Sequence, residues 1–226
     1  MKLTFFGQSC FLIETLGKQL LIDPMISPNP MASGIDINAL KPDYILLTHG
    51  HYDHVADAET IGKQAGSTVI SSYEVAGWYE KKGLKAHGMN LGGKYKFPFG
   101  TVKYVQALHS SVLPDGSHGG PAGGFVLWNE EACIYIAGDT ALTLDMQLIP
   151  KTCPKLDAAI LPVGDNFTMG YEDALIASDL IECNRIIGCH FDTFPPIKID
   201  HDLVTKAFKD QNKSIILPLI GEDIAI

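Results

Sequence analysis

Short apolar runs separated by turn residues dominate the first part of the chain. Three such runs, each typical of a β-strand, cover residues 2–6, 10–15 and 19–23. The Pro-rich segment 24–34 cannot form the interior of a helix, because proline lacks the amide hydrogen that a helix needs. The continuous apolar run 44–48 then predicts a fully buried strand.

The rest of the chain alternates between helix-like and strand-like segments. Helical patterns that end near glycine or polar residues cover residues 55–64, 73–82, 171–182 and 202–209. Apolar or β-branched runs between Gly and Pro turns predict strands at residues 68–72, 95–97, 101–108, 124–128, 133–137, 157–163, 185–189 and 215–219.

The two halves of the chain have a similar rhythm. In each half, strands precede a strand–loop–helix–strand unit, at 44–72 and again at 157–189. Two facing sheets with helices outside would satisfy this order. No linker divides the chain, so we expect a single domain of α/β (α+β) class over residues 1–226.

Composition limits the classes of partner. The 226 residues are 46% hydrophobic and 19% charged, as in an ordinary globular protein. The formal net charge of −9 disfavours nucleic acid, because a protein that binds phosphates needs a net basic face. No run approaches the roughly 18 apolar residues of a membrane helix. We therefore expect a small-molecule substrate, with no nucleic-acid or membrane partner.

Cysteine usage and the N-terminal residues indicate the compartment. The five cysteines are odd in number and show no C-x-x-C spacing, so neither a disulfide framework nor a zinc knuckle is indicated. The N-terminal segment lacks the long apolar stretch of a signal peptide. Free thiols suit a reducing compartment, and we expect a cytoplasmic protein.

The densest chemical signal is a histidine cluster directly after the buried run 44–48. His49, His51, Asp53 and His54 lie within six residues, and imidazole and carboxylate groups are ligands for zinc, iron or manganese. At the period of two, His49 and His51 point to the same side and can share one ion, while the other two can turn towards a second. The alternative is a polar surface loop with charged histidines.

Three more candidate ligands follow apolar runs elsewhere in the chain. His109, Asp139 and His190 occupy the same kind of position as His49, at the end of a predicted strand. A four-ligand loop cannot complete two metal sites, so further ligands must come from other segments. Convergence of several strand ends on one rim is the interpretation that explains all of them.

The order of these motifs resembles that of the metallo-β-lactamase superfamily. The pattern His-x-His-x-Asp-His, then an isolated His, an Asp in Gly-Asp-Thr and a late His, covers nearly the whole chain. The short sequence segments 7–10, 119–125 and 164–170 are similar to the corresponding segments of the metal-dependent hydrolase branch related to ascorbate-6-phosphate lactonase.

The resemblance implies a four-layer αββα sandwich with two divalent ions at one edge of the sheets. Zinc is the expected metal, with manganese and iron permitted by the ligand types. The implied ligand set is divided into two groups joined by Asp139: His49, His51 and His109 for one ion, and Asp53, His54 and His190 for the other.

The implied activity is hydrolysis. A metal-bridged hydroxide would attack a small ester, lactone, amide or phosphorylated metabolite, and Asp53 would orient the nucleophile or relay its proton. His118, in the glycine-rich loop 116–124, is a candidate donor on the substrate side or an exposed loop histidine. Asn166 and Thr168 either line the pocket or cap the helix that follows.

Other residues receive structural interpretations. Asp23 is expected to hold backbone groups or a ligand histidine. Cys189 is expected to be a structural thiol, and His201 a surface residue in the first turn of a helix.

The alternatives to a small-molecule hydrolase are a nuclease or a β-lactam hydrolase of the same superfamily, an iron-pair redox enzyme and a non-catalytic metal-binding protein. The sequence identifies neither the substrate nor the oligomeric state, and a homo-oligomer is compatible with it.

Overall fold

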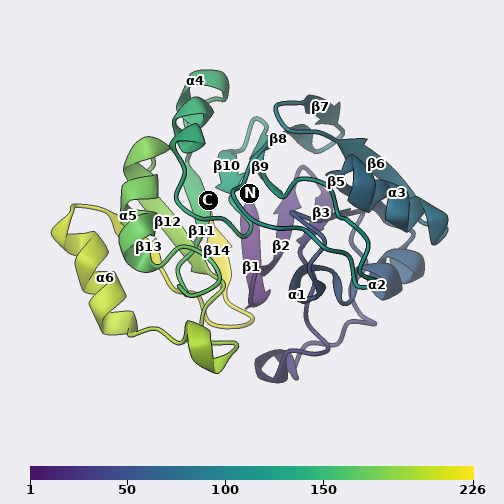
Figure 1. Ribbon diagram of the computed structural model, residues 1–226, viewed down its shortest axis with the longest axis horizontal. Helices are drawn as coiled ribbons and strands as arrows, with labels where there is room; N and C mark the ends of the chain where they lie inside the picture. Colours follow the sequence, from purple (N-terminus) through teal and green to yellow (C-terminus); the bar gives the residue numbers. More distant parts are fainter.

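The computed structural model describes residues 1–226 and contains two seven-stranded sheets packed face to face (Figure 1). Sheet A has the order β14-β1-β2-β3-β4-β5-β6, and sheet B the order β13-β12-β11-β10-β9-β8-β7. The strands of sheet A are β1 (Lys2–Gly7), β2 (Cys10–Thr15), β3 (Lys18–Ile22), β4 (Tyr44–Leu46), β5 (Thr68–Ser72), β6 (Lys85–Met89) and β14 (Asp223–Ala225). Those of sheet B are β7 (Lys94–Phe97), β8 (Gly100–Gln106), β9 (Gly123–Trp128), β10 (Cys133–Ile136), β11 (Ala158–Pro162), β12 (Arg185–Cys189) and β13 (Ser214–Ile216).

Helices cover the outer face of each sheet, which confirms the predicted αββα arrangement (Figure 1). Sheet A carries α1 (Tyr52–Val55), α2 (Ala58–Ala65) and α3 (Tyr73–Lys81), and sheet B carries α4 (Ile149–Thr152), α5 (Tyr171–Leu180) and α6 (His201–Asp210). Three short 3₁₀ turns complete the elements: η1 (Pro30–Ala32), η2 (Leu144–Leu148) and η3 (Pro195–Ile197). No helix in the structure has the length and apolar character needed to cross a bilayer.

Apolar side chains fill three layers of this sandwich. The middle layer joins the inner faces of both sheets, with Phe11 of β2 and Phe125 of β9 fully buried in it. Central strands are covered on both faces, and all five residues of β11 are buried. This double burial explains why the central strands appear in the sequence as continuous apolar runs rather than as alternating patterns.

The structure corrects several predicted boundaries. The helix predicted at 55–64 is two helices, α1 and α2. β6 was not predicted because its sequence KAHGM has no apolar alternation, and its residues are mostly exposed or half-buried at the edge of sheet A. β14 was not predicted because it is three residues long and is defined by pairing with β1, from the other end of the chain.

Strand direction determines where the loops gather. β3, β4 and β5 are parallel neighbours, as are β10, β11 and β12. β8 and β10 both pair antiparallel with β9, so they also point the same way. The Gly123 amide at the start of β9, beside the ends of β8 and β10, donates to the Thr48 carbonyl after β4 at 3.2 Å. The carboxyl ends of both sets of strands thus meet at one edge of the sandwich, which is where open α/β sheets place their ligands.

Candidate metal centre

The loop after β4 and the short helix α1 position four of the predicted ligands. His49 and His54 are fully buried, whereas His51 is half-buried. His51 has extended backbone (φ −64°, ψ 147°) directly before α1. Asp53 then lies in the first turn of that helix, where its negative charge is favourable.

Sheet B supplies the other three predicted ligands from the ends of three strands. His109 follows β8, Asp139 follows β10 and His190 follows β12. The turn before Asp139 requires Gly138, which has φ +65° and whose missing Cβ would lie 2.6 Å from the Thr48 side chain. A side chain at this position would separate the two sheets where the ligands meet.

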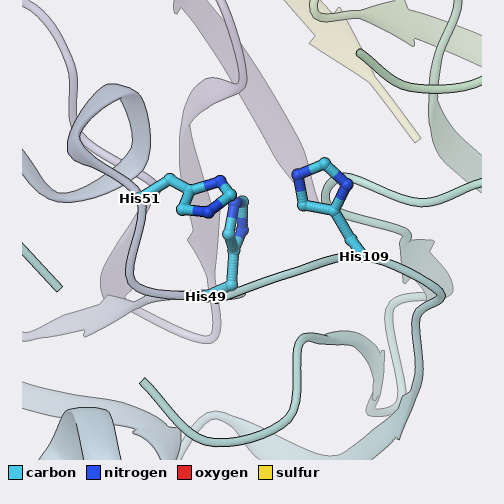
Figure 2. Close-up of side chains that lie close together, drawn as sticks. All are labelled: His49, His51 and His109. Atoms are coloured by element: carbon cyan, nitrogen blue, oxygen red, sulfur yellow. The ribbon is translucent and has the colours of Figure 1, made fainter. Parts of the chain in front are cut away.

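Three imidazoles converge in one group (Figure 2). His49 and His51 come from the loop after β4, and His109 faces them from the loop after β8. The ring centroids lie 4.5 Å apart for His49 and His51, and 5.1 Å from each of these to His109. One ligand atom from each residue lies within 4.8 Å of the others, so the structure brings this predicted set together.

The remaining four residues form a second group. His54 Nε2 lies 3.3 Å from Asp139 Oδ2 and 3.5 Å from Asp53 Oδ2. His190 Nε2 lies 3.1 Å and 3.4 Å from the same two oxygens. Bonds of about 2.0–2.1 Å to a tetrahedral ion place neighbouring ligand atoms about 3.3 Å apart, so these spacings fit one zinc-sized ion.

Asp139 lies between the two groups. The Oδ2 atom that faces His54 and His190 is also 3.6 Å from His109 Nε2. Its Oδ1 atom is buried and has no hydrogen-bond partner. Asp139 therefore faces histidines of both groups.

Two buried nitrogens test whether the site fits metal ions. The Nε2 atoms of His49 and His54 are buried and make no hydrogen bond with the protein. An unpaired buried nitrogen is costly, and a divalent cation would satisfy it. The donor set of imidazole nitrogens and carboxylate oxygens therefore fits divalent ions.

A hydrogen-bond chain behind the site fixes the orientation of these rings. Asp23 accepts from His54 Nδ1 (2.8 Å), from the Thr48 backbone amide (2.8 Å) and from the Thr48 hydroxyl (2.6 Å). The Thr48 hydroxyl lies 3.1 Å from His49 Nδ1 and can accept a hydrogen bond from its N–H group. Both histidines thus present Nε2 to the site, and the predicted supporting role of Asp23 is confirmed.

Gln8 is a site residue that the sequence reasoning missed. It lies in the β1–β2 turn with φ +53°, and its Nε2 donates to Asp53 Oδ2 at 2.9 Å. Its backbone carbonyl accepts from the His190 amide at 2.7 Å. The sequence signal at this position was the family-like segment Gly7-Gln8-Ser9-Cys10, which assigned no role to Gln8.

The carboxylates and histidines perturb each other electrostatically. Burial lowers the pKa of His190, but the Asp139 and Asp53 carboxylates outweigh burial and raise it to about 9. The pKa of His54 is raised well above its usual range for the same reason. Burial and the neighbouring His54 charge lower the pKa of His49. The second group therefore holds positive charge between its carboxylates, as a metal site is built to do.

A cavity of about 300 Å³ opens onto the centre. Five of the predicted ligands line it together with three residues that the sequence reasoning did not place there: Ser110, Phe167 and Phe194. A larger, open hollow of about 680 Å³ lies beside α3, and it contains no group of metal ligands. The smaller cavity is the candidate functional site because five of the seven ligand candidates line it.

Other predicted residues lie outside this cavity. His118 is exposed, and its Nδ1 accepts from the Gly120 amide at 2.9 Å, so its catalytic role stays a prediction. Asn166 and Thr168 neither line the cavity nor cap α5, whose N-cap is Gly170. Instead, their loop presents the neighbouring Phe167.

The structural interpretations of Cys189 and His201 are confirmed. Cys189 is buried in the core between the sheets. His201 is an exposed residue at the start of α6, and it contacts Asp192 at 2.7 Å.

Fold and site together define a hydrolase of the metallo-β-lactamase superfamily, and a family model described as a β-lactamase superfamily domain matches residues 2–190. A relative from Flavobacterium johnsoniae, named UPF0173 metal-dependent hydrolase, is 56% identical over 226 residues and covers 100% of both chains. A Thermus thermophilus protein of the same family name is 41% identical and covers 93% of this chain and 92% of its own. The chain belongs to the UPF0173 family of metal-dependent hydrolases.

Solved structures agree with this assignment. Igni18, a metallo hydrolase from the archaeon Ignicoccus hospitalis, is 31% identical, has a TM-score of 0.89 and covers 99% of this chain and 97% of its own. An isothiocyanate hydrolase from Delia radicum gut bacteria has a TM-score of 0.79 at 23% identity, with 100% and 99% coverage. The latter likeness supports the fold alone.

Proposed function

We propose that the protein is a dinuclear metal-dependent hydrolase that cleaves a small ester, lactone, amide or phosphorylated metabolite. One observation supports this most directly: seven imidazole and carboxylate side chains from both sheets face one centre, and buried histidine nitrogens there lack protein partners. Lactones are the first substrates to test, because the sequence also resembles the branch related to ascorbate-6-phosphate lactonase.

The seven residues would hold two ions in the groups described above, with Asp139 shared. When bound, the ions supply an ionised water near neutral pH and polarise the oxygen of the scissile group. Asp53, whose side chain is 27% exposed, is positioned by Gln8 and reaches the cavity, so it can orient the attacking water and accept its proton. The half-buried His51 and His109 also line the cavity, on the side of the three-histidine group.

The test combines metal content with turnover. Protein purified without added metal is examined by elemental analysis, and hydrolysis of lactones, esters, amides and phosphodiesters is measured with Zn²⁺, Mn²⁺ and Fe²⁺. His51→Ala and Asp139→Ala should lose metal and turnover together, whereas the exposed His201→Ala should keep both. Full turnover in the metal-free protein, or one ion or fewer per chain at saturation, would contradict the proposal.

A further inference from the structure

Two aromatic rings are the only apolar side chains that line the cavity over the metal centre. Phe167 is 55% exposed and Phe194 is 37% exposed. The other six lining residues are histidine, aspartate or serine. Both rings border the same cavity as the ligand candidates, so the apolar part of a molecule bound there would cover them and remove their surface from water.

The loop that carries Phe167 is anchored to the centre. A β-bridge between Gly164 and Gly170 closes the loop at its base, and the Asp165 amide donates to the Met169 carbonyl at 3.1 Å. The Met169 amide in turn donates to the carbonyl of Thr140, the residue after Asp139, at 3.0 Å. The backbone on either side of Phe167 is therefore fixed relative to a predicted ligand.

Phe194 is held by a second anchored loop, four residues after His190. Its carbonyl accepts from the Ile197 amide at 3.1 Å, and the Ile197 carbonyl accepts from the Asp192 amide at 2.8 Å. The Ile197 side chain is fully buried and fixes this turn against the protein. The two rings thus come from loops at the ends of the neighbouring parallel strands β11 and β12.

The charge around the cavity excludes one class of substituent. None of the eight lining residues is lysine or arginine, the usual partners of phosphate groups. The first turn of α5, which begins directly after the Phe167 loop, carries Glu172 and Asp173. Neither side chain lines the cavity, so a phosphate or carboxylate remote from the reacting bond would find no lysine or arginine partner there.

We infer that the substrate is an uncharged ester, lactone or amide with a small apolar or aromatic substituent that packs against Phe167 and Phe194. This inference rests on the proposed hydrolase function and narrows it. The cavity of about 300 Å³ has room for about ten water-sized groups, so the part of the substrate that it holds is small. The scissile ester, lactone or amide group lies at the metal centre, and the apolar substituent of the substrate packs against the two rings.

The first test is a homologous series of γ-lactones with alkyl side chains of zero to four carbons, compared with a phosphorylated lactone of similar size. The value of kcat/KM should rise two- to fourfold per methylene, and the phosphorylated compound should react at least tenfold more slowly than its neutral counterpart. We define a selectivity ratio as kcat/KM for the lactone with the longest alkyl chain divided by kcat/KM for the unsubstituted lactone. Phe167→Ala and Phe194→Ala should each reduce this ratio at least threefold. Tyr73→Ala removes a 72% exposed ring on α3 that lies outside this cavity, and it should leave that ratio unchanged.

The second test measures binding by calorimetry with alkyl hydroxamates of increasing length. The Kd should fall two- to fourfold per methylene in the metal-loaded protein, and less in either Phe variant. If none of the lactones, esters, amides and phosphodiesters is hydrolysed but this dependence holds, the apolar site stands and the hydrolase proposal fails.

Three results would overturn the inference: equal affinity along the series, preference for the phosphorylated lactone, or a dimer in sedimentation that Phe167→Glu dissociates. The last would assign the rings to a subunit contact.

Discussion

At the scale of single residues, the centre depends on side chains that never reach the cavity. Asp23 is fully buried and makes three hydrogen bonds, one of them to a predicted metal ligand. Such partners fix the tautomer and direction of a ligand histidine and raise its basicity. The His54 ring would otherwise be free to turn its nitrogens away from the ion.

Replacing Asp23 by Asn should weaken metal binding about 10- to 100-fold, because the amide is a poorer partner for His54 Nδ1. Competition with a chelator measures the affinity. Asp223→Asn is the matched control: this exposed carboxylate bonds to Thr4 and Lys2 on the surface and should leave the affinity unchanged. Equal affinities in the two variants would show that Asp23 does not support the ligand.

Metal uptake by the apoprotein should release protons and strengthen as the pH rises. His190 has a pKa raised to about 9 in the absence of a metal ion, so below that pH an ion must displace its proton. His54, whose pKa is also raised, adds a second proton to displace, so the affinity should increase from pH 6 to at least about 9. Calorimetry in buffers of different ionisation enthalpy measures the protons released. A pH-independent affinity would contradict the assigned ligand.

At the scale of elements, the sequence predicted the fold because buried central strands appear as continuous apolar runs. It indicated all seven ligand candidates because each lies shortly after one of the strands β4, β8, β10 and β12. The runs 68–72 and 185–189 were predicted with their observed bounds. Gln8 and the two phenylalanines were not predicted, because their roles depend on contacts between segments far apart in the chain. Gln8 and Phe167 lie in the family-like segments 7–10 and 164–170, but that resemblance assigned neither side chain a contact.

The turn that ends β10 offers a test at this scale. Gly138→Ala would force a left-handed backbone on alanine and press its Cβ into Thr48, at a cost of about 3 kcal/mol or more. Gly17→Ala has a similar φ of +69° but nothing within 4 Å, and should cost about 1–2 kcal/mol. Denaturant unfolding measures both. Only Gly138→Ala should also lower metal content. Equal unfolding free energies and equal metal contents in the two variants would contradict the predicted clash with Thr48.

At the scale of the whole molecule, the two sheets contribute separately to one centre. The loop after β4 and α1 belong to sheet A, and the other three ligands follow strands of sheet B. Ions that bind only the folded chain stabilise it by RT ln(1 + [L]/Kd).

Chelation should therefore lower the Tm. Free metal at 100 times its Kd contributes about 2.7 kcal/mol, which corresponds to roughly 5–10 °C for a chain of this size. Calorimetric scans with and without chelator measure the shift, and added metal should restore it. His51→Ala should show a smaller shift than the parent protein. A Tm that does not respond to chelation would mean that the ions do not link the sheets.

The position of Asp139 has one more consequence. Its Oδ2 atom lies within 3.6 Å of histidines from both ligand groups. A metal ion bound by one group therefore changes the electrostatic potential at the other group. Filling should therefore proceed in two unequal steps, with the first ion altering the affinity for the second. A partially loaded preparation would then contain distinct populations rather than a uniform average.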